Sequence, residues 1–221
     1  MVTVSDDATV VENDLSSGRL TCPDCGSGLA RWGWARTRPI REGTPDRTRH
    51  HRPRRARCTG CGVTHVLLSV VLAARRADGA AVIAAAVEAN TTRRWGHRRI
   101  AAWLGRPAST VRGWLRAFAA SASVIAAAFL GWTARDAPDA AAVWPAPAAG
   151  QAARALQAVS AYAAGIGDRF AVGAVTWVRA GITATAGRLF TASWWAEPLT
   201  ALTELPHFCS LKFPTPGRSV A

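Results

Sequence analysis

The sequence predicts a mainly α-helical fold with one small β module near its N-terminus. Two Cys-x-x-Cys pairs, at residues 22–25 and 58–61, enclose short segments with strand-like composition, which is typical of a small β module folded around a metal. From Asp78 to Phe118, apolar residues recur at helical spacing. The last third of the chain is alanine-rich with widely spaced charges, which favours packed helices.

Charge is unevenly distributed along the 221 residues. Residues 1–18 contain four acidic residues and no basic one, residues 19–116 contain 20 arginines and five acidic residues, and residues 117–221 are nearly balanced. A localised basic excess indicates a polyanionic partner, most often nucleic acid, because phosphate contacts release condensed counterions. A high-GC genome would explain arginine in place of lysine, but not the crowding of basic residues into one half.

Residues 1–18 are predicted to form a disordered acidic leader. The alternative is an autoinhibitory segment that competes with DNA for the basic face. The segment has no signal-peptide pattern, so we expect a cytoplasmic, nucleoid-associated protein. In that reducing compartment, paired cysteines bind metal more often than they form disulfides.

Four of the five cysteines form the two pairs, and each pair is followed by glycine. A tight turn lets both thiolates of a pair reach one metal, and the glycine permits the backbone conformation that this turn needs. Histidines at 50, 51 and 65 are further potential metal ligands. Because four thiolates already complete a tetrahedral site, we do not expect these histidines to bind the metal. The pairs predict a closed, tetrahedral, structural Zn²⁺ site with the ligands Cys22, Cys25, Cys58 and Cys61.

Tryptophans and then a basic stretch lie between the two pairs. Trp32 and Trp34 are two residues apart, so on a strand they would share one face and cover the small core, with stacking on bases as the alternative. Residues 37–57 are expected to form a long hairpin or arm that follows phosphates, and residues 63–72 to form the closing strand. The arm residues assigned to DNA are Arg52, Arg54 and Arg55.

Helical spacing begins after Asp78, the expected N-cap, and is interrupted at 91–96. The following segment, HRRIAAWLGRPASTVRGWLR (97–116), resembles the helix-turn-helix of bacterial regulators, resolvases and transposases. Gly105 lies at the turn, where a left-handed conformation is favoured. Pro107 stands where such motifs often have a capping serine, and proline is tolerated in a first turn. The positions of the inter-helix core hold Ile100, Ala101, Leu104, Val111 and Trp114.

By that resemblance, the second helix, about Ser109 to Phe118, enters the major groove of DNA. Arg112 is expected to contact a base, since arginine pairs bidentately with guanine. Gly113 costs roughly 1 kcal/mol relative to alanine inside a helix, which indicates a close approach to DNA or to a neighbouring helix. The residues placed to face DNA are Ser109, Thr110, Arg112, Gly113 and Arg116, and those expected at phosphates are Arg98, Arg99 and Arg106.

A zinc ribbon followed by this helix-turn-helix is similar to the N-terminal, end-binding halves of some insertion-sequence transposases. It resembles still more closely a family of uncharacterised actinobacterial proteins linked to mobile elements. The resemblance covers roughly residues 20–120. It rests on the sequence segments CPDCGSGLARWGWARTRP, PRRARCTGCGVTHVLL and RRIAAWLGRPASTVRGWLRAF. It implies DNA binding and little beyond it.

Residues 117–134 contain no charged residue, and this stretch is about as long as the shortest helices that span a membrane. Because most are alanine, serine or glycine, we expect a helix packed on the preceding bundle, with a membrane-attached regulator as an alternative. Residues 135–150 form a predicted linker rich in proline and alanine. Residues 151–221 are expected to be helical, with helices available for homodimerisation, and irregular towards the end, where Cys209 is an expected unpaired thiol.

An enzymatic alternative rests on Asp168 and Glu204. They have 35 residues between them, a spacing that transposases use for a two-metal carboxylate site. We interpret the spacing as coincidence, because neither residue lies in an alternating strand pattern and too little chain remains for a nuclease core. No phosphate-binding glycine loop or Ser/His/Asp set is evident either. We therefore predict a non-enzymatic protein, with a transposase or its remnant as the alternative.

The complete predicted fold is mainly α: a small β zinc ribbon with a basic arm (19–74), a helix-turn-helix three-helix bundle (75–134), and an alanine-rich helical C-terminal region. The predicted function is sequence-specific binding of double-stranded DNA, as a transcriptional regulator or a mobile-element accessory factor. No small-molecule substrate is evident. Binding is expected to combine salt-sensitive arginine contacts with base recognition by the second helix.

Overall fold

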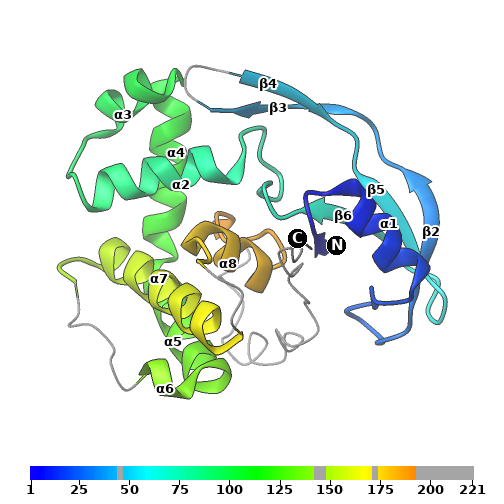
Figure 1. The fold of residues 1–221 in the computed structure, drawn as a ribbon. Coiled ribbons are helices and arrows are strands. Elements are labelled where there is room, and N and C mark those ends of the chain that lie inside the picture. The colour runs from blue at the N-terminus through cyan, green and yellow to red at the C-terminus, as the bar shows by residue number, and fades with distance from the viewer. Residues whose placement is uncertain (44–46, 142–147, 171–173, 193–221) are drawn as a thin grey trace, which may run out of the picture.

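The computed structural model describes residues 1–43, 47–141, 148–170 and 174–192, which form helices and small sheets (Figure 1). The protein is therefore mixed α/β in content rather than purely α-helical. In chain order the elements are β1 (Val2–Val4), α1 (Ala8–Ser16), β2 (Leu29–Trp34), β3 (Arg38–Glu42), β4 (Arg47–His51), β5 (Arg54–Cys58), β6 (Thr64–Ser69), α2 (Ala80–Thr91), α3 (His97–Leu104), α4 (Ala108–Ala120), α5 (Ala122–Asp136), α6 (Pro138–Ala141), α7 (Gln151–Phe170) and α8 (Trp177–Ala184).

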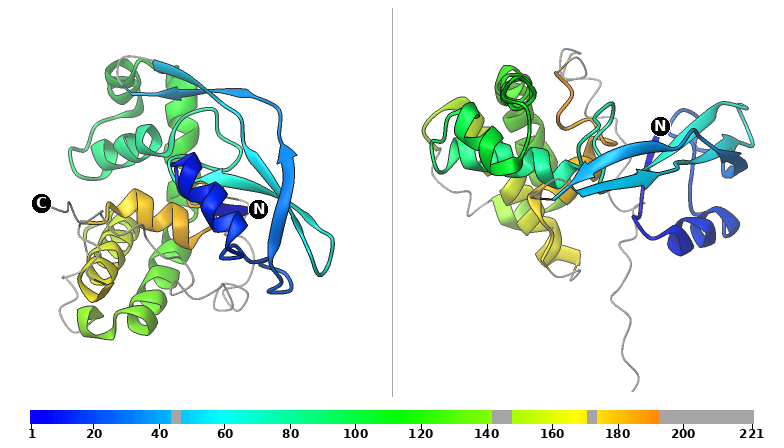
Figure 2. Two further views of the ribbon diagram at one scale, coloured as in Figure 1. Left: turned by 45° about the vertical axis from the view of Figure 1, so that its right-hand side comes forward. Right: turned by 90° about the horizontal axis from the view of Figure 1, so that it is seen from above.

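A long hairpin runs through both sheets. One sheet has the strand order β1-β6-β5-β2, with β1 parallel to β6 and the other pairs antiparallel. The second sheet is the antiparallel pair β3-β4. The chain runs out along β2 and β3 and returns along β4 and β5, and Figures 1 and 2 show this hairpin curving over towards the helices. The predicted hairpin is thus confirmed, and its outer part, residues 38–51, is called the arm below. β6 likewise confirms a strand within residues 63–72.

The first residues are an integral part of the β module, so the prediction of a disordered leader over 1–18 is wrong. β1 pairs with β6, and α1 begins at Asp7, whose carboxylate accepts a hydrogen bond from a backbone N–H in the first turn. Val11 and Leu15, one helical turn apart, are buried in a small core together with Val4 and residues of the strands. The acidic composition obscured a short helix that needs only two apolar side chains, because the sheet supplies the opposite surface.

The helices share one hydrophobic core that extends across the predicted linker (135–150). α5 packs along α7, where the Phe129 and Tyr162 rings meet edge to face with centroids 5.4 Å apart. The indole N–H of Trp177, on α8, donates a hydrogen bond to the carboxylate of Glu88, on α2. The expected helices beyond residue 151 are present as α7 and α8, and they pack into the same core as α2 to α5 (Figure 1).

The uncharged stretch over 117–134 is divided between the end of α4 and the start of α5. In the described part of the chain, no single helix is long and apolar enough to cross a membrane. The pair α4 and α5, bent by 57° at its break, passes such a test on length and composition only. Ile125, Phe129 and Trp132 of α5 are buried inside the protein, as expected for a helix that packs on the bundle.

Asp78 connects the arm to the helices. It was expected to cap α2, but Gly79 is the N-cap, and the Asp78 side chain is only 3% exposed. One carboxylate oxygen accepts a hydrogen bond from Arg41 of the arm at 2.8 Å, and the other accepts one from Arg106, after α3, at 2.7 Å. Backbone hydrogen bonds between Arg41 and residues 77 and 79 hold the arm at the same place. The arm and the turn between α3 and α4 therefore share one buried carboxylate.

Candidate metal centre and helical surface

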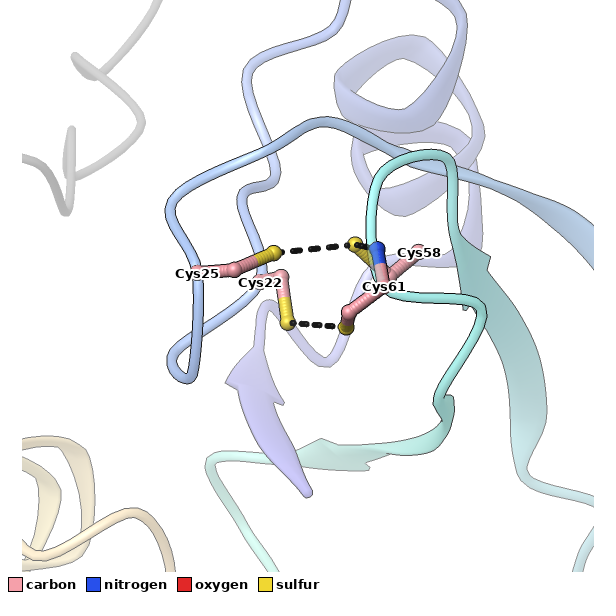
Figure 3. Close-up of side chains that lie close together, drawn as sticks. All are labelled: Cys22, Cys25, Cys58 and Cys61. Carbon is pink, nitrogen blue, oxygen red and sulfur yellow. Dashed lines mark hydrogen bonds between the residues drawn. The ribbon is translucent and has the colours of Figure 1, made fainter.

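The two cysteine pairs lie in turns of the same design at the base of the hairpin (Figure 3). In the first turn the N–H of Gly26 donates to the carbonyl of Cys22 at 2.9 Å, and in the second the N–H of Gly62 donates to the carbonyl of Cys58 at 3.2 Å. Gly26 and Gly62 have φ angles of 75° and 73°, in the left-handed region that favours glycine. The expected reason for both glycines is confirmed.

The four sulfur atoms converge on one point. The Sγ atoms of Cys22 and Cys61 are 3.8 Å apart, those of Cys25 and Cys58 are 3.4 Å apart, and all four lie within 4.8 Å of one another. None of these cysteines forms a disulfide. Tetrahedral coordination with Zn–S bonds of about 2.3 Å places sulfurs about 3.8 Å apart. The cluster is therefore compatible with a metal ion such as zinc, and the residues present fit the predicted structural site.

The protonation of the cluster also fits a cation site. Donation from the backbone N–H of Ser27, then from its hydroxyl and from Cys58, lowers the pKa of the Cys25 thiol to about 6. The backbone N–H of Val63 acts in the same direction on Cys61, but hydrogen bonding with Cys58 and burial outweigh it and raise the pKa of Cys61 to about 12. Close thiols without a cation cannot all ionise, since each thiolate repels the next. A bound divalent ion would remove that repulsion.

A histidine borders the cluster. The Nε2 atom of His65 lies 3.4 Å from the Sγ atom of Cys22, and the His65 residue is only 3% exposed. Asp24 contributes a carboxylate oxygen 3.9 Å from the same nitrogen, and these three residues form a second group of close potential ligands. Next to a metal-bound Cys22 thiolate, an N–H at Nε2 would donate a hydrogen bond to the sulfur and orient it. The other two histidines that were considered as ligands, His50 and His51, lie on β4 in the arm.

Trp32 and Trp34 do not cover the small core, so that prediction is wrong. β2 has a bulge at Trp32, where the register with β5 skips one residue. Arg57 lies over the Trp32 ring at 4.7 Å, and Arg54 lies over the Trp34 ring at 4.8 Å. Because Arg54 and Arg57 are three residues apart on one strand, they project from opposite faces of the sheet. The bulge therefore separates the two tryptophans, which are 51% and 48% exposed.

The helix pair α3–α4 has the packing that the spacing predicted. Gly105 ends α3 with φ 63° and ψ 40°, in the left-handed region, and Pro107 is the N-cap of α4. One side of each helix faces the common core, so the pair has a buried face and an exposed face. The expected core positions are all buried, namely Ile100, Ala101, Leu104, Val111 and Trp114.

The outer face of α4 is open. Ser109, Arg112, Gly113 and Arg116 are exposed, and Thr110 is half-buried. Within the described residues, neither arginine forms an ion pair. A Cβ atom added at Gly113 would meet nothing within 4 Å among the described residues, so no helix described in the structure crowds this glycine. The face is thus free to approach a partner closely.

Arg106 differs from the other predicted phosphate contacts. Its side chain is 0% exposed and its Nε atom donates to Asp78, so the prediction that Arg106 meets phosphate is wrong. Arg98 is exposed at the start of α3. Arg99 is exposed and lies over the ring of Trp95 at 4.0 Å. Trp95 also meets Trp103 edge to face, an aromatic pair that the sequence spacing did not indicate.

The three arginines just after the arm that were assigned to DNA have different surroundings. Arg52 is exposed, and Arg55 is half-buried on β5. Arg54 is largely buried, and it donates to Glu12 at 2.7 Å and to the carbonyl of Gly33 at 2.8 Å. Arg54 is therefore engaged within the fold and not free for a phosphate, which corrects its assignment.

Only one carboxylate of the enzymatic alternative lies within the described residues. Asp168 is exposed near the end of α7. Glu204 and Cys209 lie outside the described residues. Comparison with known proteins adds no relative: no family model matches the chain, and neither the curated proteins nor the solved structures searched gave a match.

Proposed function

We propose that the protein binds double-stranded DNA sequence-specifically, with α3 and α4 as a helix-turn-helix and with a zinc ribbon built on the four cysteines. The observation that carries the proposal is the outer face of α4, where Arg112 and Arg116 flank an uncrowded Gly113. An α-helix fits the major groove, and an exposed arginine can donate two hydrogen bonds to guanine. Arg112 is the proposed base contact.

The charge around this face supports DNA as the partner. Between Glu88 and Asp136 the sequence contains no acidic residue, so nothing in that stretch competes with phosphate for its arginines. Arg98 and Arg99 lie at the start of α3, which in this motif crosses the DNA backbone. The Trp95 ring holds the Arg99 guanidinium in place before binding. The Arg99 side chain therefore loses less conformational entropy when it binds a phosphate.

The metal site supports the same function indirectly. A closed four-thiolate site has no free coordination position for a substrate or a water molecule. The proposed role of the metal is therefore structural and not catalytic. Zinc would fix the base of the hairpin, and the hairpin reaches Asp78 through Arg41. Asp78 in turn holds Arg106, beside the turn that sets the angle between α3 and α4. The resemblance to transposon end-binding regions agrees with a regulator or a mobile-element accessory factor.

The salt dependence of DNA binding tests this proposal. The logarithm of the association constant for a duplex should fall linearly with the logarithm of salt concentration, by about 0.9 for each neutralised phosphate. Arg98→Ala and Arg99→Ala should each reduce the slope by about 1. Arg169→Ala, an exposed arginine on α7, is the matched control and should leave the slope unchanged. Weak binding without salt dependence would contradict the proposal.

Substitution of Gly113 by alanine should separate stability from DNA binding. Because none of the described residues crowds this position, Gly113→Ala should raise the free energy of unfolding by about 0.5–1 kcal/mol, the helix-propensity difference. The added methyl group should nevertheless weaken DNA binding if α4 lies deep in the groove. Denaturant unfolding and duplex titration of the same preparation measure both effects. A variant that is more stable and binds equally well would show that Gly113 does not approach DNA closely.

A further inference from the structure

A cavity of about 230 Å³ lies between α1 and the arm, away from the α4 surface. Its lining includes one exposed aromatic ring, Trp34, three arginines, Arg49, Arg52 and Arg54, and two acidic residues, Asp6 and Glu12. His51 also lines it, and burial and the neighbouring arginines lower the pKa of His51, which favours its neutral form. The rest of the lining comes from β1, from the start of α1 and the turn before it, and from β6. Ala8, Val11 and Glu12 of α1 line one side of this space, and Figure 1 shows α1 beside the strands of the hairpin.

Trp34 is held in place from within the fold. The Arg54 guanidinium lies over the ring at 4.8 Å, and Arg54 is itself fixed by Glu12 and by the carbonyl of Gly33. Glu12 also accepts a hydrogen bond from Arg31 at 2.8 Å, so two arginines balance its charge. The indole is nevertheless 48% exposed. A large, exposed and oriented aromatic ring beside a cavity is suited to stacking on a planar ligand.

Two nitrogen atoms nearby lack partners. Arg38 and His51 are direct neighbours across β3 and β4, and His51 lines the cavity. Arg38 Nε and His51 Nε2 are both buried, and neither has a hydrogen-bond partner among the described residues. A buried polar nitrogen without a partner has lost its water without replacement, which costs free energy, and the Arg38 Nε–H is such a donor. A ligand that brings hydrogen-bond acceptors close to these nitrogens would supply the hydrogen bonds that the fold does not provide.

Positive charge continues from the cavity along the arm. Exposed basic side chains follow one another on β4, and only Arg49 among them is paired with an acid, Glu42, within the described part of the chain. Arg52, which lines the cavity, is exposed and has no such partner. A line of arginines beside a stacking ring matches a phosphate backbone with bases, whereas a free nucleotide would contact only one end of this line. The exposed basic residues of β4 and its flank are Arg47, Arg49, His50 and Arg52.

We propose that this cavity is a second nucleic-acid site, which receives one unpaired base of a DNA strand against Trp34 while the arm binds the adjacent phosphates. A duplex is too wide to enter a space of 230 Å³, and the faces of its bases are already stacked on one another. The partner is therefore single-stranded DNA or the unpaired end of a duplex. This site depends on the cavity and not on the α4 face, so each proposal can fail without the other.

The test compares two tryptophans of nearly equal exposure on opposite faces of the same strand pair. Binding of a fluorescent oligothymidine of about 12 nucleotides is followed by anisotropy. Trp34→Ala should weaken it by about 5- to 150-fold, the usual effect of losing one stacking ring. Trp32→Ala, the matched control, should bind like the wild type. Trp34→Phe, which keeps a ring, should retain most of the affinity.

Parallel measurements exclude a loss of structure and a free-nucleotide site. Each variant should keep its thermal transition by circular dichroism and its affinity for blunt duplex DNA. Free thymidine monophosphate should compete far less well than the strand. Equal strand affinities of the Trp34→Ala and Trp32→Ala proteins, a loss in Trp34→Phe as large as in Trp34→Ala, or competition by the mononucleotide at the strand's own concentration would each overturn the proposal.

Discussion

Removal of the metal by a chelator is expected to unfold the β module and leave most of the helical core folded. The module's own core is small, with the two buried cysteines Cys22 and Cys58 among its members, whereas the helices share a much larger one. Structural zinc contributes roughly 10–16 kcal/mol of apparent binding free energy in small domains, so its loss should exceed what the small core supplies. Hydrogen exchange should show lost protection in β2, β5 and β6 and retained protection in α5 and α7.

The cysteines provide matched controls for this experiment. Cys58→Ser should reproduce the effect of the chelator, because it removes one of four ligands from a buried position. Cys209→Ser, which alters the one cysteine outside the two pairs, should retain one metal ion per chain and the wild-type exchange pattern. Re-addition of Zn²⁺ should restore protection in the chelated wild type. Unchanged protection of β2, β5 and β6 after complete metal removal would contradict a structural metal.

Replacement of Asp78 by alanine is expected to lower the free energy of unfolding by about 3–5 kcal/mol. The substitution leaves the fully buried guanidinium of Arg106 without its carboxylate and removes the ion-pair partner of the Arg41 side chain. Asp78→Asn keeps an acceptor oxygen but loses the charge, so it should fall between alanine and the wild type. Equilibrium unfolding in denaturant measures the series.

Asp14→Ala is the matched control for the Asp78 series. Asp14 also pairs with an arginine, Arg19, but both side chains are partly exposed, at 23% and 48%. Exposed pairs contribute less than about 1 kcal/mol, since solvent screens the charges. A loss in Asp78→Ala no larger than in Asp14→Ala would show that the buried carboxylate does not hold the arm and the helix turn together.

Features that depend on local geometry could be predicted from the sequence. The left-handed glycines Gly26, Gly62 and Gly105 follow from the turns that surround them, and all three have positive φ angles. The inter-helix core from Ile100 to Trp114 follows from helical spacing, and the close approach of the four cysteines follows from two matching turns at the ends of one hairpin. Each of these requires only neighbours within a few residues, or one repeated motif.

Features that depend on distant partners could not be predicted. Arg106 was assigned to phosphate from its place in the helix-turn-helix resemblance, but its partner, Asp78, is 28 residues away. The separation of Trp32 from Trp34 depends on a bulge, which is a property of the register between two strands and not of either strand alone. α1 packs against a sheet of which three strands, β2, β5 and β6, come later in the sequence, so its composition alone indicated disorder.

Selection of bound sequences from a random pool of duplex DNA tests the central claim, sequence-specific recognition by α4, most directly. The zinc-loaded wild type should enrich one motif, and Arg112→Ala should lose preference at one base pair of it, at a cost of about 1–3 kcal/mol for the preferred base. Arg169→Ala should enrich the wild-type motif. Failure of the wild type to enrich any motif, or an identical motif from Arg112→Ala, would contradict recognition of DNA by this helix.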